Sequence, residues 1–341
     1  TRRSSDLILA RSETKFYGVL FSQIVFGFIG GFLVLWICTR ISYTFWRKYS
    51  FYFFLGSLLL TLAVFIPGLG FAHGGARRWI DVGPVSFQPA EVLKIAFVIY
   101  FSAWLAWTRK QQEDIKFRIL PLFVMLAVVA GALLRQPDTK SLILIIAAAC
   151  GMLFTSGVSW KKIGVIIAIG ITAVGVLAFV RPYVMDRIKT FLDPAHDPRG
   201  ASYQLQQSLI AIGSGGISGR GLGQSVQKFN YLPEPQGDSI FAVIGEEFGF
   251  IGTLTLLVLY VFFAIRGYKI ALRAPDTFAR YLVVGLITLL FAQSFLNIAS
   301  LVGLFPLTGV PLVFISQGGT ALMFALAAVG IILNISRYEK K

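Results

Sequence analysis

One carboxylate in this sequence stands where a side chain could take a proton from a bound molecule. Asp238 ends a turn-rich stretch that reads Leu-Pro-Glu-Pro-Gln-Gly-Asp, and a long apolar run begins at the next residue, Ser239. A lone carboxylate at the mouth of a cavity between apolar helices could act as a general base. The alternative is a helix N-cap, a position at which Asp is favoured.

A second acidic residue in this apolar run does not complete a carboxylate pair. Glu246 lies two helical turns beyond Asp238, about 12 Å along an α-helix. That separation is too large for two carboxylates acting on one glycosidic bond. Neither His73 nor His196 is placed to activate a serine, so a nucleophilic triad is unsupported. We retain Glu246, together with Glu234, as a supporting residue.

Several basic residues could bind an anionic ligand. Arg77 and Arg78 follow two glycines, and two guanidinium groups beside a pliable backbone suit a diphosphate. The alternative is that they anchor the loop to anionic lipid headgroups. Lys94, Arg220 and Lys228 are further candidates for binding a diphosphate.

Glu91 and Lys94 are spaced as i and i+3 within another apolar run, which places them on one helix face. Charges inside a membrane are costly, so they are usually paired and functional. A structural pair that braces the bundle is as well supported as a direct role.

A glycine-rich stretch at residues 213–223 reads GSGGISGRGLG. It fits neither the dinucleotide-binding pattern nor the P-loop pattern. Its glycines either let the backbone approach a bulky sugar or belong to a tightly folded loop.

Composition sets the class of protein. Of 341 residues, 56% are hydrophobic and 14% are charged, whereas soluble domains carry about 25% charged residues. The net charge of +15 comes from basic residues between long apolar runs, which indicates membrane loops rather than nucleic-acid binding. Two cysteines and two histidines argue against a disulfide framework and against a His/Cys metal site.

Runs of about 20 apolar residues predict an all-α polytopic membrane protein with about nine spans. The predicted spans are residues 17–38, 49–69, 89–107, 119–134, 141–157, 163–180, 239–265, 281–302 and 311–335. Residues 1–341 read as a single membrane domain, with an ordered, functional loop at residues 181–238. The distribution of Lys and Arg among the loops predicts a cytoplasmic C-terminus and a long loop on the outer face.

At these motifs the sequence resembles the SEDS family of FtsW and RodA, the membrane polymerases of peptidoglycan. The resemblance covers nearly the whole chain and is strongest at residues 74–94, 193–249, 310–319 and 333–337. Residues 221–228 and 231–234 are more similar to FtsW than to RodA. Members of the family have ten spans, so the resemblance implies that the first helix is missing from this chain.

The resemblance also implies an activity and a location. The family joins lipid II units at the outer face of the bacterial cytoplasmic (inner) membrane, with a glycan chain on undecaprenyl diphosphate as donor and the 4-hydroxyl of lipid II as acceptor. Its catalytic aspartate falls on Asp238, and its required Glu and Lys fall on Glu91 and Lys94. The implied partners are a class B penicillin-binding transpeptidase, other membrane proteins of the division or elongation machinery, and membrane lipids, with no nucleic acid.

The sequence departs from the family pattern at four places. Residues 236–239 read Gln-Gly-Asp-Ser where His-Thr-Asp-Phe is usual, Ala90 replaces Ser, Gln317 replaces Tyr, and Thr139-Lys140 replaces Leu-Gly. Asp238 is retained, so we expect activity to be retained as well.

A diphosphate is already a good leaving group, so the implied reaction needs one base and positive charge on the diphosphate. Displacement in one step would invert the anomeric centre. A divalent cation such as Mg or Mn is an optional helper, and no cofactor is certain.

Two other functions fit parts of the sequence. A lipid II flippase would place binding groups near the membrane midplane, but the inner halves of the predicted spans carry few ionisable groups. A non-catalytic scaffold of the cell-wall complex would make Asp238 dispensable.

Overall fold

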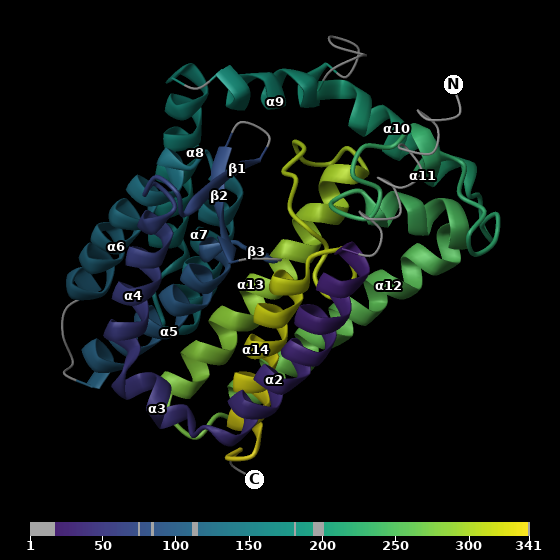
Figure 1. The fold of residues 1–341 in the computed structure, drawn as a ribbon. Coiled ribbons are helices and arrows are strands. Elements are labelled where there is room, and N and C mark those ends of the chain that lie inside the picture. Colours follow the sequence, from purple (N-terminus) through teal and green to yellow (C-terminus); the bar gives the residue numbers. More distant parts are fainter. Residues whose placement is uncertain are drawn as a thin grey trace.

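The computed structural model describes residues 18–73, 76–82, 85–110, 115–180, 182–193 and 201–339, which form a helix bundle (Figure 1). The helices, in chain order, are the π-helix η1 (Ser22–Gly30), α2 (Gly31–Arg40), α3 (Tyr43–Lys48), α4 (Ser50–Ala63), α5 (Pro89–Lys110), α6 (Ile115–Arg135), α7 (Thr139–Thr155), α8 (Trp160–Val180), α9 (Pro182–Leu192), α10 (Ala201–Ser214), α11 (Gln227–Asn230), α12 (Ile240–Leu272), α13 (Thr277–Leu301) and α14 (Gly319–Ser336). The start of the first predicted span, at residue 17, lies outside the described residues.

The helical, multi-pass membrane architecture is confirmed. Among the described residues, five helices are long and apolar enough to cross a membrane: Gly18–Arg40, Pro89–Arg109, Ile240–Leu272, Thr277–Leu301 and Gly319–Ser336. Large apolar side chains such as Phe28, Trp36, Phe250 and Phe262 are exposed on the outside of the bundle, as expected of a surface that faces lipid.

Two predicted spans are longer than the helices that they contain. The span at residues 49–69 becomes α4, which ends at Ala63 because the chain then turns toward a strand that begins at Gly70. The span at residues 311–335 becomes α14, which begins only at Gly319. Phe314 has a φ of 68°, which an α-helix does not contain, so residues 311–318 form an irregular segment despite their apolar composition.

Helix α13 is the centre of the bundle and packs against α12, α7 and α5. Its side chains Phe278, Tyr281, Leu286 and Ile287 are buried, and they belong to the same apolar core as Phe97 of α5. A helix surrounded in this way carries apolar residues on all sides, which is why the sequence shows a continuous apolar run here.

A small antiparallel sheet, which the sequence analysis did not predict, follows α4. Its strands are β1 (Gly70–His73), β2 (Ala76–Val82) and β3 (Val85–Phe87), in the order β1-β2-β3. Strands this short show no clear alternation of apolar and polar residues, so the sequence pattern does not reveal them. The sheet lies at the same end of the bundle as α9 and α10 (Figure 1).

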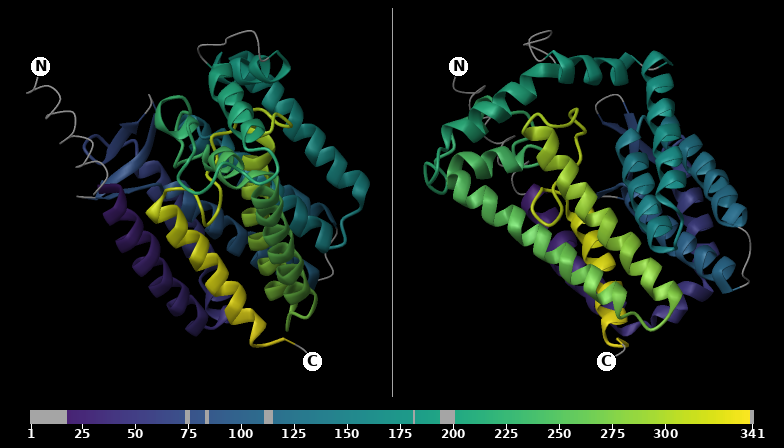
Figure 2. Two further views of the ribbon diagram at one scale, coloured as in Figure 1. Left: turned by 90° about the vertical axis from the view of Figure 1, so that its right-hand side faces the viewer. Right: turned by 180° about the vertical axis from the view of Figure 1, so that it is seen from behind.

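Where the structure describes the long loop, much of it is helical. It contains α9, α10 and α11, and these helices lie across one end of the bundle, opposite the end that carries α3 and the α12–α13 connection (Figures 1 and 2). The predicted first residue of the loop, Arg181, and residues 194–200 lie outside the described part.

Helix α12 is broken at Gly249, where φ is 65° and ψ is −162°. The glycine-rich loop closes this break. The carbonyls of Glu246 and Glu247 each accept a hydrogen bond from a loop amide at 3.0 Å, and the two amides after Gly249 donate to loop carbonyls at 2.9 and 3.1 Å. The loop thereby satisfies backbone groups that an unbroken helix would have paired internally. In this structure the glycines serve the tightly folded loop, which is the second interpretation of the sequence.

We predict that Gly219→Ala destabilises the protein. Gly219 has a φ of 80°, and a Cβ there would lie 2.2 Å from the carbonyl oxygen of Glu247. The substitution is expected to lower the free energy of unfolding by about 1–3 kcal/mol, measured as a lower Tm of the detergent-solubilised protein.

The matched control is Gly213→Ala. Gly213 lies in α10, and a Cβ added to it would meet no atom within 4 Å, so the change should leave the Tm unchanged or raise it slightly. Equal Tm values for the two variants would show that the loop does not pack against the α12 break.

Candidate active site around Asp238

Asp238 is held through both its backbone and its carboxylate. Its backbone carbonyl accepts a hydrogen bond from Nδ2 of Asn297 at 2.7 Å. Its Oδ1 accepts one from Nε2 of Gln204 at 3.1 Å, and Oγ of Ser239 lies 3.4 Å from the same oxygen. The N-cap position of α12 belongs to Ser239, so the N-cap alternative for Asp238 is wrong. The carboxylate therefore remains available for another role.

The loop before Asp238 is fastened to the irregular segment at residues 310–318. Oγ of Ser316 donates to the carbonyl of Gly237 at 2.6 Å, and the amide of Gln317 donates to the carbonyl of Gln236 at 2.7 Å. Asn297 joins the two segments, because its Nδ2 also donates to the carbonyl of Val310 at 2.7 Å. These bonds fix the position of the carboxylate.

Two cations that the sequence analysis did not assign to the site lie beside Asp238. Nζ of Lys140 donates to the carbonyl of Gly309 at 2.8 Å, and Nη1 of Arg187 donates to the carbonyl of Thr308 at 3.0 Å. A Cβ on Gly309 would lie 3.3 Å from Oδ2 of Asp238 and 3.9 Å from Nη2 of Arg187. The carboxylate and both cations thus gather around the backbone of Gly309.

Burial raises the pKa of the Asp238 carboxyl above its ordinary value. The hydrogen bond from Gln204 and the charge on Lys140 lower the pKa, whereas the nearby charge on Glu234 raises it, and the net shift is upward. A raised pKa makes the ionised carboxylate a stronger base, which suits proton abstraction near neutral pH.

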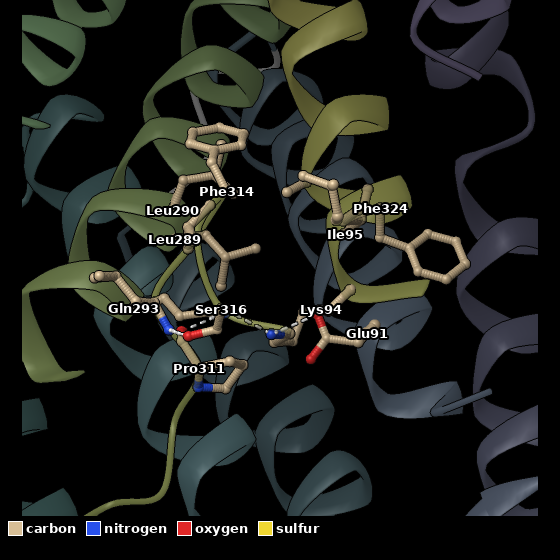
Figure 3. A pocket seen from close by; sticks show the side chains of 15 residues that line it. Glu91, Lys94, Ile95, Leu289, Leu290, Gln293, Pro311, Phe314, Ser316 and Phe324 are labelled. Carbon is tan, nitrogen blue, oxygen red and sulfur yellow. Dashed lines mark hydrogen bonds and ion pairs between the residues drawn. The ribbon is translucent and has the colours of Figure 1, made fainter. Parts of the chain in front are cut away.

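The predicted ion pair between Glu91 and Lys94 is present. Nζ of Lys94 lies 2.9 Å from Oε2 of Glu91 and donates to Oε1 of Gln293, also at 2.9 Å. These side chains line a narrow cavity between α5, α13, α14 and the segment at residues 311–316 (Figure 3). Gln293 in turn donates to the carbonyl of Pro311 at 3.2 Å. The pair therefore supports the segment that holds the Asp238 loop.

Arg77 and Arg78 of β2, which the sequence suggested as diphosphate ligands, have different environments in the structure. Arg77 is exposed, whereas Nε of Arg78 donates to the carbonyl of Gln136 at 2.9 Å and its Nη2 donates to that of Pro137. Arg78 thus ties β2 to the connection between α6 and α7. The charges of Asp138, Arg78, Glu91 and Asp238 all act on Lys140, so these four residues lie near one lysine.

Arg220, Lys228 and Glu246 belong to a second cluster. Nη1 of Arg220 lies 3.3 Å from Glu246, and Nζ of Lys228 lies 2.7 Å from Glu247. Oγ of Ser225 donates to the buried Glu246 at 2.6 Å. Carboxylates partner both cations, so the cluster fastens the glycine-rich loop to α12 and is not joined to Asp238 by any hydrogen bond or ion pair between described residues.

Four residues of the site were not identified from the sequence: Gln204, Lys140, Arg187 and Asn297. Asn297 could have been suspected from the sequence, since a polar amide within an apolar span usually has a structural or functional partner. Lys140 was noticed only as a departure from a family pattern. Gln204 and Arg187 lie in the long loop, where polar residues are common, so only the folded structure distinguishes them.

Within the described ranges, no group of three or more His, Cys, Asp or Glu side chains is close enough to hold a metal ion without further ligands.

Comparison with known proteins shows the family of this chain. The model of the FtsW, RodA and SpoVE family, described as "Cell cycle protein", matches residues 4–341. A "Probable peptidoglycan glycosyltransferase FtsW" of Geobacter sulfurreducens is 42% identical over 312 residues, which cover 90% of this chain and 82% of the relative. "Stage V sporulation protein E" of Bacillus subtilis is 36% identical over 318 residues, covering 93% and 87%.

Solved structures show the same architecture. A chain described under "Structural coordination of polymerization and crosslinking by a peptidoglycan synthase complex" aligns with a TM-score of 0.77 and 27% identity, covering 94% of this chain and 90% of that one. The rod shape determining protein RodA of Thermus thermophilus aligns with a TM-score of 0.69 and 25% identity, covering 95% and 89%. The match along nearly the whole sequence and the agreement in fold show that this chain belongs to the FtsW/RodA/SpoVE family.

Proposed function

We propose that this protein is a peptidoglycan glycosyltransferase that polymerises glycan strands, with Asp238 as its general base. The observation that carries the proposal is the grouping of one half-buried carboxylate of raised pKa with Lys140 and Arg187 around Gly309. The names of the relatives as peptidoglycan glycosyltransferases support the same reaction.

The reaction follows from this grouping. Asp238 accepts the proton of an acceptor sugar hydroxyl, and the hydroxyl oxygen forms a bond to the anomeric carbon of the donor. The bond from that carbon to the diphosphate breaks, and its electron pair leaves with the diphosphate oxygen. Positive charge beside the departing diphosphate stabilises the transition state. Attack opposite the leaving group inverts the anomeric centre, and no acid is needed to protonate a diphosphate.

The finer substrate assignment rests on family membership. The donor is a glycan chain carried on undecaprenyl diphosphate, and the acceptor is the 4-hydroxyl of lipid II. The gathering of Asp238, Lys140 and Arg187 at the end of the bundle covered by α9 and α10 supports chemistry at one membrane face rather than at the midplane (Figure 1).

Location and partners complete the proposal. Family membership supports a location in the bacterial cytoplasmic membrane. The distribution of basic residues supports a cytoplasmic C-terminus and Asp238 on the outer face. A penicillin-binding transpeptidase is the proposed partner, supported by the likeness to a chain from a peptidoglycan synthase complex. Other proteins of the division or elongation machinery are proposed on family membership alone.

We expect Asp238→Asn to reduce polymerisation by roughly 10²- to 10⁴-fold, because the amide cannot accept the proton. The measurement is gel separation of glycan strands made from lipid II by purified protein together with its transpeptidase partner. Asn can keep the contacts to Gln204 and Asn297, so the Tm should remain that of the wild type.

Asp186→Asn is the matched control, since this carboxylate is exposed on α9 of the same loop and is expected to be neutral for activity. Polymerisation at the wild-type rate by the Asp238 variant would exclude the base assignment. Lipid II movement across vesicles without strand formation would instead favour the flippase alternative.

We also predict how the rate depends on pH. A general base works only when deprotonated, so the rate should fall as pH falls through the raised pKa of Asp238. Gln204→Leu removes a hydrogen bond that stabilises the charged carboxylate, so the pKa should rise further and the acidic limb of the pH–rate profile should move to higher pH.

Gln207→Leu, on the same helix, should leave the acidic limb unchanged. Coincident acidic limbs for the wild type and the Gln204 variant would indicate that another group controls the rate.

A further inference from the structure

A cavity lies between α7, α9 and the connection from α13 to Gly309, the residue that the Asp238 carboxylate approaches. Its walls are mostly apolar, and two cations lie among them. The lining includes Lys140, Ile143, Val184, Arg187, Ile188 and Thr308. A wall of this composition suits an amphiphile that joins an apolar chain to an anionic head.

The charge of Lys140 is not cancelled by a direct ion pair. Its Nζ donates to the backbone carbonyl of Gly309, and no carboxylate among the described residues lies within ion-pair distance of it. By contrast, Arg220 and Lys228 each face a carboxylate at 3.3 Å or less. Of these three cations, Lys140 is therefore better placed to attract a ligand anion.

The cavity is also close enough to Asp238 for the proposed reaction. Thr308 lines it, and Oδ2 of Asp238 and the Arg187 guanidinium both lie close to the next residue, Gly309. An anion held by Lys140 and Arg187 would place the sugar carbon attached to it beside Asp238. The acceptor hydroxyl that attacks this carbon would then lie within reach of the carboxylate.

We propose that Lys140 and Arg187 bind the diphosphate of the lipid-linked donor in this cavity, with the lipid chain along the wall formed by Ile143, Val184 and Ile188. The proposal rests on the proposed function and deepens it by assigning the donor side of the site. It replaces the sequence-based candidates Arg220 and Lys228.

Binding measured apart from turnover tests the proposal. Undecaprenyl diphosphate is titrated into purified protein in nanodiscs of zwitterionic lipid, with undecaprenol and phosphatidylglycerol as separate ligands. Lys140→Met and Arg187→Met should each raise the Kd for the diphosphate by roughly 10- to 100-fold, as expected from the loss of a charge-assisted hydrogen bond. The Kd for undecaprenol should change less than about twofold.

Lys189→Met is the matched control, since it removes an exposed cation from the same helix as Arg187 and should not change the Kd. Arg187→Lys should restore part of the affinity, because it keeps the charge and loses the planar fork. A Tm within the wild-type range shows that each variant is folded.

The outcomes separate this inference from the proposed function. Unchanged diphosphate affinity in both folded methionine variants would overturn the inference even if the wild type polymerises lipid II. If the methionine variants lose diphosphate affinity and the wild type forms no glycan strands, the inference is supported and the polymerase function is rejected. An equal loss of affinity for phosphatidylglycerol would identify an ordinary lipid site and overturn the donor assignment.

Discussion

Backbone groups that leave regular structure within a membrane protein need partners inside the protein, because lipid supplies none. Most of the site depends on this constraint. At Gly249, where α12 breaks, loop amides and carbonyls supply the missing partners. At residues 310–318, Asn297 and Ser316 supply them, and the same two side chains also bind the backbone of the Asp238 loop. Asn297 and Ser316 therefore position the carboxylate and also satisfy the backbone of the irregular segment.

The charges of the protein divide into those that build the fold and those left for a ligand. Glu91 neutralises Lys94, and Glu247 neutralises Lys228, at 2.9 and 2.7 Å. Arg78 is used to bind backbone carbonyls. Removing one partner from any of these contacts would leave a buried polar group unpaired. Lys140 differs, since its hydrogen bond to a carbonyl leaves its charge in place.

The sequence predicted those features that depend on residues close together in the chain. The apolar runs predicted the membrane helices, the i, i+3 spacing predicted the Glu91–Lys94 pair, and the turn-rich stretch drew attention to Asp238. Contacts between distant segments could not be predicted, because no local pattern links Gln204 or Arg187 to Asp238. Composition also misled at residues 311–318, where apolar residues form an irregular segment held by hydrogen bonds rather than a helix.

Two requirements on Asp238 conflict, and the site meets both. The carboxylate must be ionised to act as a base, yet a strongly stabilised carboxylate is a weak base. Burial raises its pKa, while Gln204 and Lys140 limit the rise. A diphosphate bound to Lys140 would cancel the charge that lowers the pKa and would add negative charge nearby. Donor binding would therefore raise the pKa of Asp238 further, so that the base becomes strongest when the sugar it serves is in place.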